Sequence, residues 1–139
     1  MSNELWDLYA DAVIDCGIDG APRSLSGADA GALPAIPLFV LTAYNPGGEV
    51  RDRERNEADQ SRLEHELTAI GMTFWPANGQ SADASWSEPG VAVAGIDRAH
   101  ACDLGSRYGQ LAIYELTADE VHVVCCIDRE IVRTRARRR

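Results

Sequence analysis

A tryptophan and a carboxylate occur together in the segment Trp86-Ser87-Glu88-Pro89-Gly90, directly before the apolar run 91–95. Proline restricts the backbone here, so we expect Glu88 to be held at the end of a buried strand. A carboxylate removed from water can act as a general base or contact a ligand, with Trp86 as a wall. The alternative is structural: Trp86 covers the core edge and Glu88 accepts hydrogen bonds from backbone donors. Glu88 is therefore the candidate catalytic residue.

More polar residues gather where the apolar run 37–44 ends, at Thr42 and Asn45. The sequence Asn45-Pro46-Gly47-Gly48 predicts a type II turn, because proline presets the second turn position and glycine permits positive φ at the third. Gln110 brings another amide to the start of the apolar segment 111–116. These side chains are candidate ligand contacts at strand ends.

The segment 51–70 predicts a helix whose buried face changes character along its length. Leu63, Leu67 and Ile70 form an apolar stripe, and the same spacing continues through Gln60 and Asn56 toward the turn. Because a buried amide without hydrogen bonds is costly, both amides must find partners. Either they bind backbone groups of the turn, or they line a polar pocket.

Motifs for phosphate, metal or nucleophilic chemistry are missing from the sequence. The chain has no lysine, no glycine-rich phosphate loop and no G-x-S-x-G. Its three histidines lie far apart, and its four cysteines show no C-x-x-C spacing. We therefore expect no cofactor, no metal site and free buried thiols.

The net charge of −9 is unevenly distributed, because five arginines fall in the last seven positions: Arg133, Arg135, Arg137, Arg138 and Arg139. The acidic remainder would repel phosphate backbones. The arginine segment is expected to be a solvated tail or a weak contact for nucleic acid or an acidic partner. No apolar run reaches the roughly 18 residues that span a bilayer, and the N-terminus lacks a signal pattern, so we expect a cytoplasmic protein without membrane contact.

The order of elements predicts an α+β fold. Helices are expected at 3–16, 51–70 and 96–104, and strands at 37–44, 72–77, 91–95, 111–116 and 121–127. These form a single domain, a mixed or antiparallel sheet of about five strands with two or three packed helices. The division expected is an N-terminal helix and Gly/Ala/Pro-rich linker (1–36), an α+β core (37–127) and an Arg-rich tail (128–139).

An ordered set of short segments resembles a family of uncharacterised bacterial proteins, domain of unknown function 3293. The segments are LTAYNPGG (41–48), Asn56, LEHELTAIG (63–71), WSEPGVAVAGI (86–96) and LGSRYGQLAIYEL (104–116), within roughly 37–127. The resemblance does not indicate any particular activity. It implies ten signature positions, whether functional or structural: Thr42, Asn45, Pro46, Asn56, Trp86, Glu88, Pro89, Gly90, Gly109 and Gln110.

Three functions remain open at this point. The first is a binding module in which Thr42, Asn45, Asn56, Trp86, Glu88 and Gln110 form a pocket for a small polar ligand, nucleoside- or amino-acid-like. The second is a hydrolase-type enzyme with Glu88 as base. The third is an interaction protein that uses its arginine segment. Scarce nucleophiles favour the first.

Overall fold

The computed structural model describes residues 3–18, 20–27 and 29–137. Within these residues the chain forms three α-helices and eight β-strands. In chain order they are α1 (Asn3–Ala10), β1 (Val13–Ile18), β2 (Ala21–Ser24), β3 (Leu38–Leu41), α2 (Arg53–Ala69), β4 (Thr73–Gln80), β5 (Ser87–Ala94), α3 (Arg98–Arg107), β6 (Ala112–Leu116), β7 (Glu120–Cys125) and β8 (Ile131–Ala136). No helix in this part of the chain is both long and apolar enough to cross a membrane.

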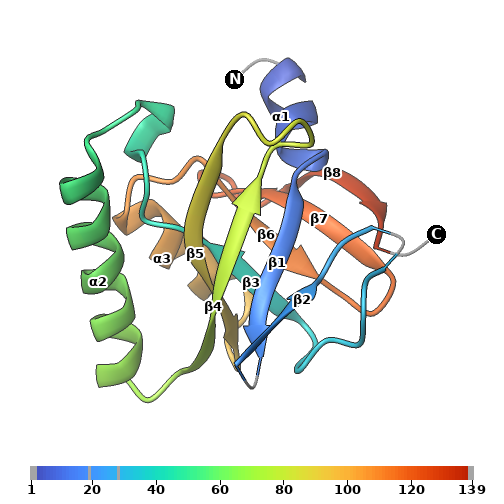
Figure 1. The fold of residues 1–139 in the computed structure, drawn as a ribbon, viewed down its shortest axis with the longest axis horizontal. Helices are drawn as coiled ribbons and strands as arrows, with labels where there is room; N and C mark the ends of the chain where they lie inside the picture. The colour runs from blue at the N-terminus through green and yellow to red at the C-terminus, as the bar shows by residue number, and fades with distance from the viewer. Residues whose placement is uncertain (1–2, 19, 28, 138–139) are drawn as a thin grey trace.

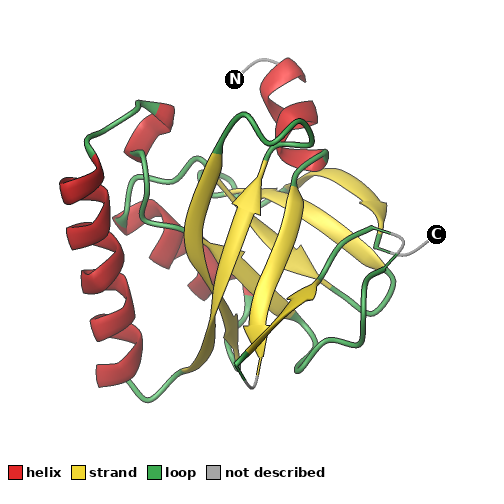
Figure 2. Ribbon diagram, viewed as in Figure 1, coloured by secondary structure: helices red, strands yellow, loops and turns green. Residues whose placement is uncertain are grey.

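All described strands join one antiparallel sheet in the order β2-β1-β4-β5-β3-β6-β7-β8. The sheet curves into a half-barrel, with α2 and α3 beside its outer face and α1 at one open end (Figures 1 and 2). The α+β class is confirmed. The expected count of about five strands is wrong, because the sequence patterns did not predict β1, β2 and β8.

Two of the missed strands lie in the region expected to be a helix followed by a linker. The helix ends at Ala10, and β1 alternates between partly buried and buried residues, with Ile14, Cys16 and Ile18 inside. The short spacing of apolar residues over 12–16 fits a helix as well as a strand, and pairing with β4 decides in favour of the strand. Gly20, with φ of 78°, lies in the turn that leads into β2.

The third missed strand, β8, contains most of the segment expected to be a solvated arginine tail. Arg133 forms an ion pair with Asp7 (2.8 Å), and Arg135 donates to the Ala12 carbonyl. Arg137 is 1% exposed and donates to backbone carbonyls. These arginines therefore belong to the folded body, whereas Arg138 and Arg139 lie outside the described residues.

Buried apolar residues lie on both faces of the sheet. On the helix-covered face, Phe39 and Leu41 of β3 pack with Leu63 and Leu67 of α2. Inside the half-barrel, residues of β1 and β7 share a second cluster with β3, which includes Ile14, Val121 and Val40. Because β1 and β7 are far apart in strand order, their contact requires the sheet to curve around this interior.

The helix α1 is fixed to the last strands at the open end of the half-barrel. Trp6 is buried against Val123 and Cys125 of β7. The hydroxyl of Tyr114 on β6 donates to the backbone carbonyl of Tyr9 at 2.9 Å. The C-terminal turn of α1 is thereby held next to the ends of β3, β5 and β6.

Candidate functional site

The turn after β3 has the positive φ at its third residue and the closing hydrogen bond that a type II turn requires. Gly47 has φ of 70° and ψ of 10°, and the Gly48 amide donates to the Asn45 carbonyl at 2.9 Å. Asn45 itself adopts a left-handed conformation with φ of 48°. Asparagine tolerates this region better than most residues, which suits it to this corner.

The two amides of α2 hold this turn in place. Asn56, Gln60, Leu63 and Leu67 are buried along one face, as predicted, whereas Ile70 is exposed, contrary to expectation. Gln60 Oε1 accepts from the Ala43 amide at 3.0 Å, and Asn56 Oδ1 accepts from the Asn45 amide at 2.9 Å. Both amides therefore bind turn backbone groups.

Asn45 links the turn to the carboxylate of Glu88. Its Oδ1 accepts from Asn56 Nδ2 at 2.8 Å and from the Arg51 amide at 3.0 Å. These bonds leave Asn45 Nδ2 to donate to Glu88 Oε2 at 2.8 Å. A relay of hydrogen bonds thus runs from buried Asn56 through Asn45 to Glu88 and fixes one carboxylate oxygen.

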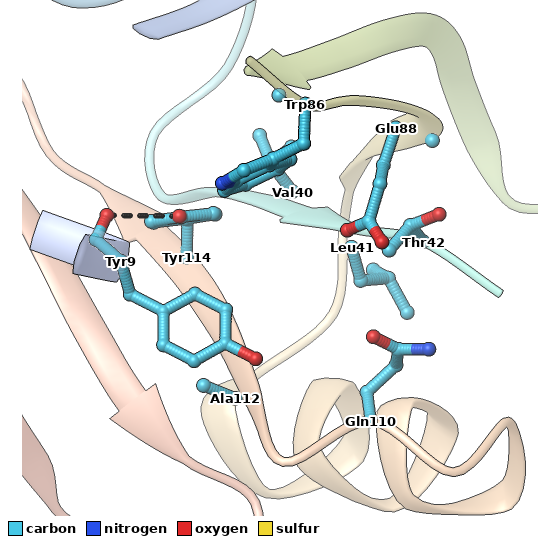
Figure 3. Close-up of a pocket in the computed structure, with 11 residues that line it drawn as sticks. Tyr9, Val40, Leu41, Thr42, Trp86, Glu88, Gln110, Ala112 and Tyr114 are labelled. Carbon is cyan, nitrogen blue, oxygen red and sulfur yellow. Dashed lines mark hydrogen bonds between the residues drawn. The ribbon is translucent and has the colours of Figure 1, made fainter. Parts of the chain in front are cut away.

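Glu88 faces a small cavity of about 40 Å³, here called the inner cavity, beside Tyr9 of α1 (Figure 3). Of the six predicted contacts, Thr42, Trp86, Glu88 and Gln110 line this inner cavity, and Tyr9 and Tyr114 close it from other elements. Asn56 lies behind Asn45 and lines neither this cavity nor its neighbour. The volume corresponds to about three water molecules.

Three oxygen atoms in the inner cavity have no hydrogen-bond partner in the described part of the chain. Gln110 Nε2 donates to the Tyr44 and Tyr108 carbonyls at 3.0 and 3.2 Å, and its Oε1 faces the cavity. Glu88 Oε1 and the Tyr9 hydroxyl face the same space (Figure 3). Two of these atoms can only accept hydrogen bonds when Glu88 is ionised, and the hydroxyl can accept or donate.

An outer hollow of about 250 Å³ adjoins the inner cavity on the solvent side. Tyr9, Trp86 and Glu88 line both spaces, so the two are adjacent at these side chains. The rest of the outer hollow is formed by Leu5, Leu8, Asn45, Gly48 and Val50. Asn45 therefore reaches the site here, beside Glu88.

Burial alters the titration of both acids that face the inner cavity. It raises the pKa of Glu88 above its ordinary value, and the hydrogen bond from Asn45 partly opposes that rise. Burial also raises the pKa of the Tyr9 hydroxyl, and the nearby Glu88 carboxylate raises it further. Among the described residues that line the two spaces, Glu88 has the only charged side chain. Its negative charge is therefore without a cationic partner there.

Several signature positions have structural roles beside this site. Thr42 donates to the Pro89 carbonyl at 2.5 Å and accepts from the Tyr44 amide, so its hydroxyl is already used. A Cβ atom on Gly90 would overlap the Leu41 carbonyl. A Cβ atom on Gly109 would lie 2.6 Å from Pro46 Cβ. These contacts keep β5, β3 and the turn close together.

The sequence did not indicate Tyr9 and Tyr114 as site residues. Tyr9 fits the apolar stripe of a short helix, and Tyr114 fits the alternation of a buried strand. Their ring centroids lie 6.4 Å apart in an edge-on arrangement. No local motif marks such a pair, because it forms only when α1 is packed against β6.

A family model described as "Protein of unknown function (DUF3293)" matches residues 41–113, just over half of the chain. The range is narrower at both ends than the resemblance suggested. It includes all six predicted contact residues and excludes α1 with Tyr9. No curated protein and no solved structure matches the chain. The cytoplasmic location and the ligand-contact roles stay predictions.

Proposed function

The chain belongs to the DUF3293 family of proteins of unknown function, and we propose that its inner cavity binds the ammonium or N–H-rich head group of a small organic cation. The single observation that supports this is an unpaired, partly buried carboxylate next to two other oxygen atoms in one cavity. A cation would pair with Glu88 Oε1, and its remaining N–H groups would reach Gln110 Oε1 and the Tyr9 hydroxyl.

The aromatic lining favours a cation as well. Trp86, Tyr9 and Tyr114 surround the inner cavity (Figure 3). The faces of such rings attract positive charge, which adds to the attraction of the carboxylate. An anionic ligand would instead be repelled by Glu88, since no basic side chain of the described residues lines either space.

Of the two ligand types expected from the sequence, the amino-acid-like one fits better. Its ammonium group is small enough for the inner cavity, provided that its carboxylate points outward, away from Glu88. A nucleobase is larger than about three water molecules and its N–H groups are neutral. The ligand class proposed is therefore an amine.

Binding can be tested with methylammonium, ethylammonium and guanidinium, using acetamide and acetate as uncharged and anionic controls. Shifts in the backbone amide spectrum at Gly90 and Gln110, in the wild type and in Glu88→Gln, would measure affinity. We expect the variant to lose about ten- to a hundredfold in affinity for the cations, the value of a charged hydrogen bond. Glu49→Gln removes an exposed carboxylate nearby and should change little. Equal binding of acetamide and the cations would contradict the proposal.

A hydrolase-type reaction with Glu88 as general base is the second candidate, favoured by the raised pKa of Glu88. The two candidates differ in what Glu88→Gln should do. A base variant loses turnover and keeps ligand affinity, whereas a binding variant loses affinity. Unchanged turnover in Glu88→Gln, once a reaction is found, would exclude Glu88 as its general base.

Contact of the arginine segment with nucleic acid or an acidic partner has less support. Arg133 is paired with Asp7, and Arg135 and Arg137 donate to backbone carbonyls. Deleting 133–139 would also remove part of β8, so RNA retention after that deletion would not isolate the arginines.

A further inference from the structure

We infer that the ligand of this site is an amphipathic amine, whose apolar body lies in the outer hollow while its ammonium group reaches Glu88. This inference rests on the proposed function and specifies its ligand. The outer hollow is about six times larger than the inner cavity, 250 against 40 Å³. Because the inner cavity is small and shares Tyr9, Trp86 and Glu88 with the outer hollow, we place the rest of the ligand in the outer hollow.

The outer hollow has an apolar rim that the fold leaves open to solvent. Leu8 on α1 is 57% exposed, and Val50 after the turn is 92% exposed. Both line the hollow together with Leu5. Single exposed apolar residues are ordinary, but these come from two separate elements and face one space.

The arrangement of charge gives the ligand a direction. Glu88 lines both spaces, and its Oε2 is bound to Asn45, which lines the outer hollow, while Oε1 faces the inner cavity. No other charged side chain of the described residues lines the outer hollow. A chain of methylene groups or a ring would therefore meet apolar walls, and only its amino end would find a counter-charge.

The expected signature is an affinity that rises with the length of the apolar part. Each methylene removed from water improves affinity about three- to fourfold. We expect this slope over the series from ethylammonium to hexylammonium, until the outer hollow is filled. Phenethylammonium, a compact aromatic amine, should also bind more tightly than ethylammonium.

Three variants separate this inference from the proposed function. Leu8→Ser and Val50→Ser should flatten the slope, because each replaces an apolar part of the wall of the outer hollow by a hydroxyl. Ile127→Ser is the matched control, because Ile127 is 81% exposed and lines neither space. Spectral shifts at Gly90 and Gln110 report binding in each protein, and hexanol controls for binding that needs no ammonium group.

The possible outcomes are distinct. If no amine binds, or if Glu88→Gln binds all of them as well as the wild type, the proposed function fails. If amines bind through Glu88 but affinity does not change with chain length, or Leu8→Ser and Val50→Ser keep the wild-type slope, this inference is overturned and the proposed function stands. If the exposed rim instead mediates self-association that these two variants abolish without changing the slope, the inference is likewise overturned.

Discussion

Asn45 Nδ2 donates a hydrogen bond of 2.8 Å to Glu88 Oε2, joining the turn after β3 to the start of β5 across 43 residues of sequence. Asn56 in turn orients Asn45 by accepting from its amide and donating to its side-chain oxygen. The carboxylate is thus held at one oxygen and open at the other. Asn45 is a positioning residue for Glu88 in this arrangement.

Asn45→Ala should raise the pKa of Glu88 further. Burial already raises that pKa, and the hydrogen bond from Asn45 opposes the rise by stabilising the ionised carboxylate. Without the Asn45 side-chain amide as donor, nothing opposes the effect of burial on the pKa of Glu88. Carbon-detected NMR titration of the Glu88 carboxyl group measures the change directly. Arg53→Ala, an exposed residue outside this relay, is the control and should leave the Glu88 titration unchanged. A lower or unchanged pKa in Asn45→Ala would contradict the relay.

Glu88→Gln should stabilise the unliganded protein at neutral pH. The folded-state pKa of Glu88 is raised above its ordinary value of 4.5, so ionisation favours the unfolded chain. The contribution of protonated Glu88 is present below pH 4.5 and is lost as pH rises through the folded-state pKa. Glutamine does not titrate and can still accept from Asn45.

The difference in free energy of unfolding between Glu88→Gln and the wild type should therefore be larger at pH 7.5 than at pH 4, in favour of the variant. Urea denaturation at both pH values measures it. Glu49→Gln, at an exposed carboxylate, provides the comparison. A difference that shrinks with rising pH would show that Glu88 is stabilised as a carboxylate in the free protein, against the idea of an unpaired charge awaiting a cation.

Much of the turn and α2 could be predicted from the sequence because their determinants are local. The Pro46-Gly47 pair fixes the turn type, and helical spacing places Asn56 and Gln60 on the buried face that points at it. What these amides bind could not be decided from spacing. Their partners, the amides of Ala43 and Asn45, come into reach only when β3 and α2 pack together.

The half-barrel and the position of Tyr9 in the cavity could not be predicted from local sequence patterns. The strand β1 could not be predicted because the apolar residues at 12–16 suit a helix equally well. The strand β8 could not be predicted because a segment rich in arginine is usually exposed to solvent. Yet β8 anchors α1 through Arg133 and Asp7, and α1 brings Tyr9 to Glu88. Because β8 was not predicted, the position of α1 and the place of Tyr9 in the cavity could not be predicted either.

Gly109→Ala should destabilise the protein more than Gly71→Ala. Both glycines have nearly the same positive φ, 73° and 75°, so alanine carries a similar backbone cost at each, about 1–2 kcal/mol. Only at Gly109 would the new Cβ meet a neighbour, Pro46 Cβ at 2.6 Å, whereas nothing lies within 4 Å at Gly71. Overpacking adds about 1–3 kcal/mol.

Thermal or urea unfolding of the two variants measures this difference. Gly79→Ala, which has open space and no positive φ, gives the baseline for a glycine replacement. Equal losses at Gly109 and Gly71 would mean that the turn can move away from α3 without cost. In that case Gly109 would not explain how the turn is held in place.

Arg137→Leu should be strongly destabilising although the residue lies near the end of the described chain. Arg137 is 1% exposed, and its guanidinium donates to Ala118 O at 3.1 Å, to Leu25 O at 3.3 Å and to Gly31 O at 2.8 Å. It therefore ties the end of β8 to the β6–β7 turn and to the segment after β2, across the two edges of the sheet (Figure 1).

Leucine would leave three backbone carbonyls without that donor, so we expect a loss of at least about 2 kcal/mol in free energy of unfolding. Arg133→Leu on the same strand removes a partly exposed ion pair with Asp7 and should cost no more than about 1 kcal/mol. Hydrogen exchange should also show faster amide exchange in β2 for Arg137→Leu. If the two variants are equally stable, Arg137 does not hold the two edges of the half-barrel together. The arginine segment would then again be a candidate contact surface for nucleic acid or an acidic partner.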